Sequence, residues 1–237
     1  MAAIPREYIS IIIPTYNEDK YLPLLLKKLS EVDNVECVKE IIVSDGKSTD
    51  NTISVANKFW IRVIVNGQPG RARQMNAGAK MATGQILYFL HADSTPPAGF
   101  IRQILAAHAS GTVAGCFRLR FDWSHWFLKL NAWFTRFNIN AFRFGDQSLF
   151  ITKDLFNMIG GFREDYILME DQEIVYRIAR HTRFRVLPDY ITTSARKYRV
   201  NGAFRMQAIF FYIYCVYFLG ASQQTLKSIY QKLIQTP

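Results

Sequence analysis

The sequence predicts an α/β protein with a mixed, mainly parallel sheet flanked by helices. Runs such as Tyr8–Ile13 and Ile86–Leu90 are almost wholly apolar, which is typical of strands that are buried on both faces. Segments with apolar residues at helical spacing separate these runs. A strand–helix alternation of this kind predicts parallel βαβ units with right-handed crossovers.

The expected elements follow in a regular order along the first half of the chain. Strands are expected at residues 8–13, 40–44, 62–65 and 86–90, and helices at residues 21–32, 51–59 and 73–82. Thr15 and Glu18 have the spacing of a capping box for the first of these helices. The less regular second half predicts helices at 100–109 and 170–181, a strand at 115–121 and an aromatic helical stripe over 123–138.

Composition limits the class of protein and of partner. The 237 residues carry a net charge of +10, which suits a phosphorylated substrate or an anionic membrane surface. The basic residues form no dense run, so we expect no nucleic-acid partner. Cys37, Cys116 and Cys215 lack CxxC spacing, so neither a disulfide framework nor a zinc site is expected. The apolar run at 9–13 is too short for a signal peptide, and a cytoplasmic location is expected.

Three of the expected strands end in polar residues. The sequences are PTYNE at 14–18, SDGKSTD at 44–50 and HAD at 91–93. Ligands of parallel sheets bind beyond the carboxyl ends of the strands. We therefore expect these three segments to meet in one pocket.

Two of the motifs suit a nucleotide diphosphate. Asp45 could accept a hydrogen bond from the N3–H group of uracil, although its segment also reads as an ordinary turn. Arg71 and Arg73 precede a helix of small residues in GQPGRARQMNAGA, where backbone N–H groups and positive charge suit phosphate. The segment does not match the dinucleotide pattern GxGxxG. The alternative to a phosphate site is a helix of small residues with an exposed basic end.

Two further motifs carry candidate chemistry. Asp93 could bind a divalent cation that bridges two phosphates, since Mg²⁺ and Mn²⁺ favour oxygen ligands. His91 could add a nitrogen ligand, which Mn²⁺ tolerates better, but we prefer a hydrogen-bonding role for it. Glu170 and Asp171 begin a helix, where either could be a general base; capping of the helix is the alternative.

The order of these motifs resembles that of family-2 glycosyltransferases, which have the GT-A fold, a Rossmann-like α/β architecture. The resemblance rests on PTYNE, DGKSTD, GRARQMNAGA, FLHAD, FGDQ and LMED, and it covers residues 8–200. The chain looks most like a bacterial branch of rSAM/selenodomain-associated transferases, some of them linked to arsenosugar biosynthesis.

The resemblance implies a role for each matching residue. The donor nucleotide is expected to contact Pro14, Thr15, Asn17, Glu18, Asp45, Arg71, Arg73, Asn76 and Ala92. Asp93 is expected to hold the metal, and Asp146 and Gln147 to face the acceptor. Asp171, beside Glu170, is expected to deprotonate the acceptor hydroxyl for an in-line displacement that inverts the anomeric carbon.

Some features depart from the family pattern or stay open. Gly46 follows Asp45 where many relatives have a second aspartate, and His91 replaces the first Asp of Asp-x-Asp. The Gln-x-x-Arg-Trp motif of processive synthases does not follow Asp171. Asp146 could instead make a structural hydrogen bond. Arg196, with Lys197 and Arg199, could close over the diphosphate, or these residues could form a solvated basic loop.

The C-terminal region is expected to form an appendage. Residues 1–202 are assigned to the catalytic domain, with a nucleotide-binding half at about 1–98 and an acceptor half at about 99–202, and residues 203–237 to a helical appendage. Residues 208–221 carry no charge but are too few to span a bilayer. Peripheral membrane contact at the inner face, a homodimer, and packing against residues 123–137 all stay open.

The sequence thus predicts a metal-dependent, inverting, non-processive glycosyltransferase with a UDP-sugar donor and an unidentified acceptor. A lipid-linked acceptor would follow from membrane contact. One alternative is a nucleotidyltransferase, but PTYNE lacks the Gly-rich basic loop which that class needs after its first strand. The other is a non-catalytic basic protein that uses this fold to bind membranes or nucleic acid.

Overall fold

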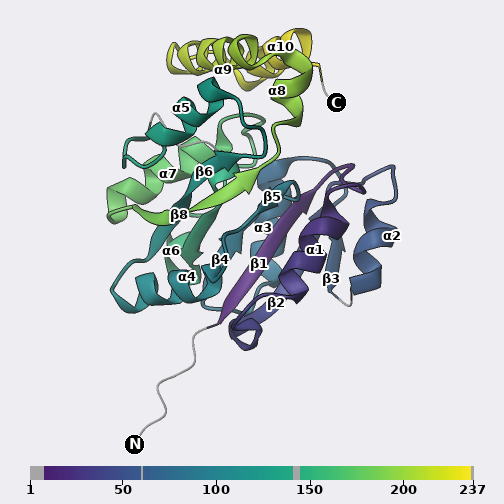
Figure 1. The fold of residues 1–237 in the computed structure, drawn as a ribbon, viewed down its shortest axis with the longest axis vertical. Helices are drawn as coiled ribbons and strands as arrows, with labels where there is room; N and C mark the ends of the chain where they lie inside the picture. Colours follow the sequence, from purple (N-terminus) through teal and green to yellow (C-terminus); the bar gives the residue numbers. More distant parts are fainter. Residues whose placement is uncertain (1–7, 60, 141–144, 236–237) are drawn as a thin grey trace, which may run out of the picture.

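The computed structural model describes residues 8–59, 61–140 and 145–235, and its strands form an eight-stranded sheet. The strand order is β3-β2-β1-β4-β7-β6-β8-β5, and helices pack on both faces (Figure 1). The strands are β1 (Ile9–Thr15), β2 (Val38–Asp45), β3 (Arg62–Val65), β4 (Ile86–Phe89), β5 (Ser94–Thr95), β6 (Ala114–Phe121), β7 (Leu149–Thr152) and β8 (Arg185–Thr193). The α-helices are α1 (Leu22–Ser30), α2 (Thr52–Ala56), α3 (Arg71–Met81), α4 (Phe100–Ala109), α5 (Trp126–Phe134), α6 (Lys153–Met158), α7 (Glu170–His181), α8 (Arg196–Asn201), α9 (Ala203–Phe218) and α10 (Gln223–Leu233).

The first half of the sheet is the predicted parallel unit. β1 pairs in parallel with β2 and β4, and β2 pairs in parallel with β3. All seven residues of β1 are buried, as expected for a strand covered on both faces. Thr15 lies opposite Asp45 in the register, so the polar ends of β1 and β2 lie side by side.

The second half makes the sheet mixed. β7 runs antiparallel to both β4 and β6, whereas β8 runs parallel to β6. The short strand β5 pairs antiparallel with the end of β8. The Ser194 N–H donates to the Asp93 carbonyl at 3.1 Å, so the HAD turn is attached to the end of β8.

The predicted helix boundaries agree with the structure to different degrees. The helices at 100–109 and 170–181 are confirmed as α4 and α7, whereas α3 begins at Arg71, two residues before the predicted start. The capping box is wrong, because β1 continues through Thr15 and α1 begins only at Leu22 with no side-chain cap. The Thr15 hydroxyl donates to Asp45 at 2.9 Å instead.

The two faces of the sheet have separate apolar cores. One core packs α1 and α4 against the sheet, and the other packs α3, α6 and α7 against the opposite face. Gly78 of α3 faces β1 so closely that an added Cβ would lie 2.4 Å from Cγ2 of Ile12. This close approach fixes the position of α3, whose first residue is Arg71.

Helices α9 and α10 pack side by side and form a C-terminal hairpin, which lies beyond the carboxyl ends of β1 and β4 (Figure 1). Met206, Ile213 and Leu226 are buried between these helices. The rings of Phe127 on α5 and Phe204 on α9 lie 4.4 Å apart, so the predicted aromatic stripe packs partly on α9. Among the described residues, no helix combines the length and the apolarity needed to cross a membrane.

Candidate active site

The loops after β1 and β2 are tied together by buried polar side chains. Asp45 is 0% exposed, and its carboxylate accepts hydrogen bonds from the Thr15 hydroxyl, the Ser48 N–H and the Ser48 hydroxyl. The Gln74 amide on α3 donates to the carbonyls of Thr15 and Ser44. Asp45 therefore has no exposed surface for the predicted contact with a base, and in this structure its carboxylate holds the two loops together.

The end of β4 is connected to α8 through an arginine. Arg196 Nη1 donates to Glu18 Oε2 at 3.0 Å, and Arg196 Nη2 lies 3.3 Å from Asp93 Oδ2. Burial raises the pKa of Asp93, and the negative charge of Asp146 adds to the rise, while Arg196 opposes it. Burial alone would lower the pKa of Arg196, but the hydrogen bond and the charge of Glu18 raise it. Arg196 therefore stays charged between two carboxylates.

A second arginine joins α3 to the start of α7. Arg71 Nε donates to Glu170, and Arg71 Nη2 donates to Asp171 Oδ2 at 2.7 Å. The Glu170 side chain is only 1% exposed, whereas that of Asp171 is 18% exposed. Burial raises the pKa of both carboxyl groups, and the charge of Arg71 opposes the rise. Of the pair, Asp171 is therefore the carboxylate that a substrate can reach.

These groups line one cavity of about 400 Å³, a size that suits a small-molecule ligand. Arg71, Asp93, Asp146, Asp171 and Arg196 form its polar end. Each guanidinium group there pairs with two carboxylates: Arg71 with Glu170 and Asp171, and Arg196 with Glu18 and Asp93. Glu18 and Glu170 do not themselves line the cavity. Of the three segments expected to meet in one pocket, only HAD lines this cavity, through Asp93. Glu18 of PTYNE reaches it by pairing with Arg196, while SDGKSTD contacts PTYNE away from the lining, and residues from α7 and α8 complete the polar end.

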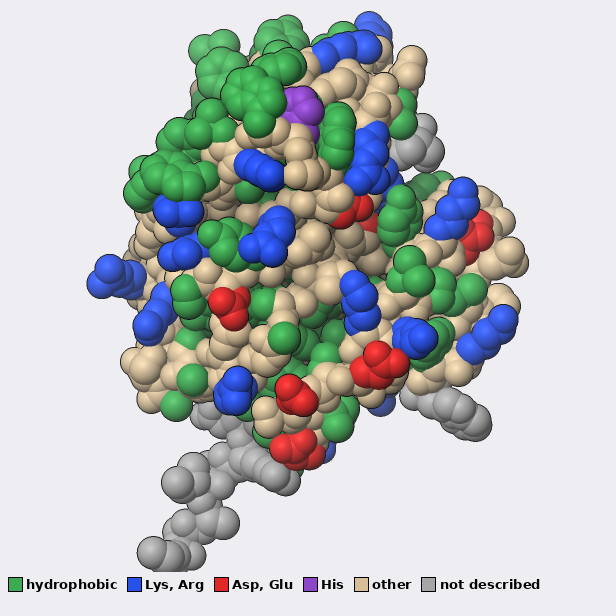
Figure 2. All heavy atoms as spheres, in the orientation of Figure 1, with side chains coloured by type: hydrophobic (Ala, Val, Ile, Leu, Met, Phe, Trp, Pro, Cys, Tyr) green, Lys and Arg blue, Asp and Glu red, His purple; other side chains and the backbone are tan. Residues whose placement is uncertain are grey.

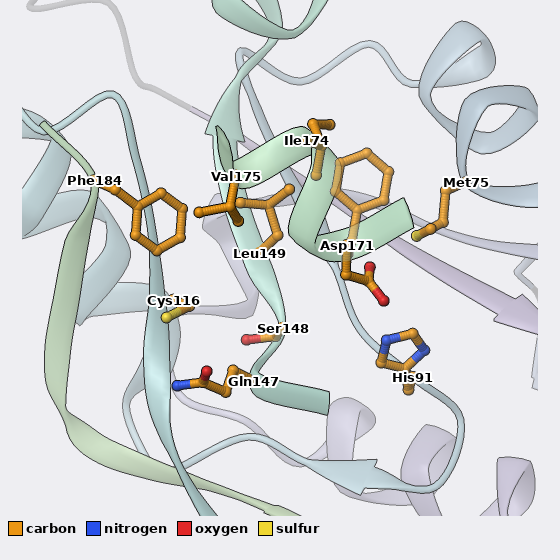
Figure 3. Close-up of a pocket in the computed structure, with 11 residues that line it drawn as sticks. Met75, His91, Cys116, Gln147, Ser148, Leu149, Asp171, Ile174, Val175 and Phe184 are labelled. Atoms are coloured by element: carbon orange, nitrogen blue, oxygen red, sulfur yellow. The ribbon is translucent and has the colours of Figure 1, made fainter. Parts of the chain in front are cut away.

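A smaller cavity of about 20 Å³ lies behind Asp171. Figure 3 shows His91 and Asp171 directed toward one another on its polar side, with Leu149, Val175 and Phe184 on the other side. This volume would hold little more than one water molecule, so the cavity is no substrate site. Burial lowers the pKa of His91, and the nearby charge of Arg71 lowers it further, so the imidazole is neutral.

The side chains of the cavity fit a divalent cation that takes most of its ligands from a bound phosphate compound rather than from the protein. Across residues 8–59, 61–140 and 145–235, no three His, Cys, Asp or Glu side chains group closely enough to form a metal site by themselves. Asp93, however, is a partly exposed carboxylate whose pKa is raised by partial burial and by the charge of Asp146, while Arg196 opposes the rise, and a cation would relieve the repulsion between the two carboxylates. Mg²⁺ commonly uses one or two carboxylates together with substrate phosphates. Asp93 fits that role.

The remaining predicted residues do not line the large cavity. Exposed Asn17 accepts from the Thr49 N–H at 2.9 Å, while Pro14 and Ala92 are buried. Arg73 donates to Gln68 at 2.7 Å on the surface.

Both ends of the Asn76 amide bind the backbone of Phe162, and the Gln147 amide donates to the Phe117 carbonyl at 3.2 Å. Phe144, the first residue of FGDQ, lies outside the described residues.

Two groups of residues at the site were not predicted from the sequence. One is Gln74, whose crosslink between two strand ends has no motif to reveal it. The other is the apolar wall of the cavity, contributed by β6, α9 and α10 and including Phe121, Phe210, Phe211, Tyr214 and Tyr230. The high aromatic content of residues 208–221 was a signal for this wall, but it gave no indication of which surface the rings would face.

The fold and the sequence now define the class of protein. Residues 10–167 match the sequence profile of Glycosyl transferase family 2. Because this match spans more than half of the chain, the protein belongs to glycosyl transferase family 2, a family of sugar-transferring enzymes.

Two curated relatives match parts of the chain. It is 32% identical over 102 residues to a dolichyl N-acetyl-alpha-D-glucosaminyl phosphate 3-beta-D-2,3-diacetamido-2,3-dideoxy-beta-D-glucuronosyltransferase of Methanococcus voltae, a match that covers 40% of this chain and 32% of the relative. It is 30% identical over 130 residues to an undecaprenyl-phosphate 4-deoxy-4-formamido-L-arabinose transferase of Proteus mirabilis, covering 51% and 40% of the two chains. The matches thus span less than half the length of either relative.

Two solved structures have the same fold. Staphylococcus aureus TarS 1-349 in complex with UDP superposes with a TM-score of 0.67 at 20% identity, covering 79% of this chain and 60% of that one. The mannosyltransferase PcManGT from Pyrobaculum calidifontis, in complex with GDP-Man and Mn²⁺, gives a TM-score of 0.69 at 21% identity, covering 86% and 61%. At these identities the likeness shows the GT-A fold alone.

Proposed function

We propose that this protein is a metal-dependent, inverting, non-processive glycosyltransferase that uses a nucleotide-diphosphate sugar, with UDP as the nucleotide. The proposal rests on one observation: Asp93, Asp171 and Arg196 line the same large cavity. A solved neighbour that is named as a UDP complex supports the choice of nucleotide. The neighbour named with GDP-Man and Mn²⁺ supports a divalent cation.

The donor would bind over the strand ends. The loops held together by Asp45 would form the floor of the nucleotide site, and exposed Asn17 lies on its rim. Arg196 would meet the diphosphate, because its guanidinium already lies beside Asp93. A divalent cation held by Asp93 would neutralise the charge of the diphosphate.

Asp171 would be the catalytic base. Its carboxylate takes the proton of the acceptor hydroxyl while the acceptor oxygen attacks the anomeric carbon from the side opposite the diphosphate. The bond between the anomeric carbon and the diphosphate oxygen breaks, and Arg196 faces the negative charge that develops on the leaving group. One displacement inverts the configuration. Arg71 holds Asp171 in place through its 2.7 Å hydrogen bond, and its charge opposes the rise in the pKa of Asp171 that burial causes.

The finer assignments belong to the same proposal. We keep residues 1–202 as the catalytic domain and residues 203–237 as an appendage that completes the acceptor side of the cavity. The motif run GRARQMNAG…FLHADS…FGDQ…LMED supports membership of the rSAM/selenodomain-associated branch. Release of the product after each transfer is expected, because Gln-x-x-Arg-Trp does not follow Asp171.

Substitution of the base tests the proposal. Asp171→Asn keeps the shape of the side chain but cannot accept the proton, so UDP release from a panel of UDP-sugars should fall by about 10²- to 10⁴-fold. UDP affinity, measured by calorimetry, should change little. The matched control is Asp165→Asn, at an exposed carboxylate that pairs with Arg163 outside the cavity. Equal turnover by the wild type and Asp171→Asn would contradict the assignment.

A further inference from the structure

The large cavity has a second, apolar end that donor chemistry does not use. Its lining also includes Phe121 at the end of β6, Phe210, Phe211 and Tyr214 of α9, and Tyr230 of α10. The α9–α10 hairpin therefore lines the same cavity as Asp171. A molecule that brings a hydroxyl group to Asp171 must pass along these rings.

The described lining of the cavity carries equal numbers of the two charges, with Arg71, Arg196 and Lys197 against Asp93, Asp146 and Asp171. Arg71 pairs with Glu170 and Asp171, as described above, and Arg196 pairs with Glu18 and Asp93. The third cation, Lys197, lies with its Nζ 5.6 Å from the centre of the Tyr230 ring. Once Arg196 meets a donor diphosphate, Arg71 stays paired with Glu170 and Asp171, so Lys197 alone of the described lining would face an anionic acceptor, against the carboxylates of Asp146 and Asp171. An uncharged hydroxyl compound suits the lining better.

The apolar wall continues to the outside of the molecule. Phe211 lines the cavity and is also 65% exposed, so its ring lies at the mouth. Figure 2 shows apolar side chains gathered at the top of the molecule, around the C-terminal hairpin and α5, where Trp126 and Phe204 are exposed. An acceptor with an apolar body could therefore contact the rings of α9 in the cavity and at the surface, where Phe211 is exposed.

We infer that the acceptor is an uncharged amphipathic molecule, with a hydroxyl group at Asp171 and an alkyl or aromatic body against the rings of α9 and α10. Its role as acceptor rests on the proposed function, whereas the ligand class rests on the cavity itself. The body removes apolar ring surface from water, and this burial supplies most of the affinity.

A series of glucosides that share one head group tests the inference. Methyl, phenyl and n-octyl β-glucoside, the last below its micelle concentration, are titrated calorimetrically into the full chain without donor or metal. The phenyl or the octyl compound should bind at least about tenfold more tightly than the methyl compound. A preference for octyl indicates a lipid-like body and a preference for phenyl an aromatic one. Equal affinity for all three would overturn the inference.

Two neighbouring aromatic residues localise the binding. Phe211→Ala removes a ring from the cavity wall and should weaken the preferred probe by about fivefold to tenfold. Tyr212→Ala is the matched control, because Tyr212 is 51% exposed on the same helix but does not line the cavity. It should change the affinity by less than about twofold. Equal losses in both variants, or no loss in Phe211→Ala, would show binding elsewhere and overturn the inference.

The charge of the head group and the independence of the test are checked in the same series. Octyl phosphate should bind no more tightly than octyl glucoside, and a clear preference for the phosphate would overturn the assignment of an uncharged acceptor. A separate titration with UDP and Mn²⁺ keeps the two proposals distinct. If UDP does not bind but the glucosides show the expected preference, the transferase proposal is overturned. If UDP binds but the glucosides all bind equally, only the inferred class of acceptor is overturned.

Discussion

At the polar end of the cavity, charged side chains from distant parts of the sequence neutralise one another, whereas the apolar end is walled by aromatic rings from the last two helices. Arg71 reaches Glu170 and Asp171 about a hundred positions further along the chain. Phe210, Phe211 and Tyr214 of the apolar end follow one another within one helix. The polar end depends on contacts between distant elements, while most rings of the apolar end come from the hairpin, with Phe121 of β6 beside them.

The difference assigns a separate task to each end. Charged groups on a rigid sheet can hold a diphosphate and a base in fixed geometry, as a displacement reaction requires. Half-exposed rings on a hairpin contribute contact area with little demand on geometry. Substrate selection at the apolar end can therefore change without altering the chemistry at the polar end.

The largest expected effect on the polar end comes from the packing of α3 on β1. Gly78→Ala would place its Cβ 2.4 Å from Ile12, so the helix must shift and the free energy of unfolding should fall by about 1–3 kcal/mol. Chemical denaturation measures the change. Gly67→Ala is the control, because nothing lies within 4 Å of a Cβ there, and it should alter stability by less than about 0.5 kcal/mol. Equal stability of the two variants would mean that this contact does not set the position of Arg71.

A smaller effect, confined to low pH, is expected from Arg71→Gln. Burial raises the pKa of Asp171, and the charge of Arg71 opposes that rise. Removal of the charge raises the pKa further, and the base must be ionised, so activity should be lost at a higher pH as the solution is acidified. Turnover well above this pH should fall less. A profile of UDP release against pH measures the change, and an unmoved acid limb would contradict the role given to Arg71.

The strand ends and the helix start that carry the polar end could be predicted from sequence because their signals are local, whereas the pairing of their charged side chains could not. Apolar strands that end in PTYNE, SDGKSTD and HAD indicate a parallel sheet with polar groups along one edge, and β1, β2 and β4 end within these segments or just before them. The helix at Glu170–His181 was predicted from its acidic start and apolar spacing. Each of these signals lies within a few residues of the feature that it predicts.

The rest depends on tertiary contacts that no local pattern contains. The burial of Asp45 results from Thr15 and Ser48 closing over its carboxylate, whereas the motif alone suited an exposed base contact equally well. Residues 208–221 are apolar and aromatic, a composition that suits a membrane surface, a dimer or a core. Only the fold shows that part of this segment lines the cavity beside Asp171.

The most direct test of the central claim is calorimetric titration of the wild type and of Asp93→Asn with UDP, with and without Mn²⁺. UDP should bind the wild type, Mn²⁺ should tighten this binding, and Asp93→Asn should lose the gain due to Mn²⁺. GDP and TDP serve as comparison ligands and should bind more weakly. If none of the three nucleotides bound the wild type in the presence of Mn²⁺, the polar end would not be a nucleotide-sugar site and the account would be contradicted.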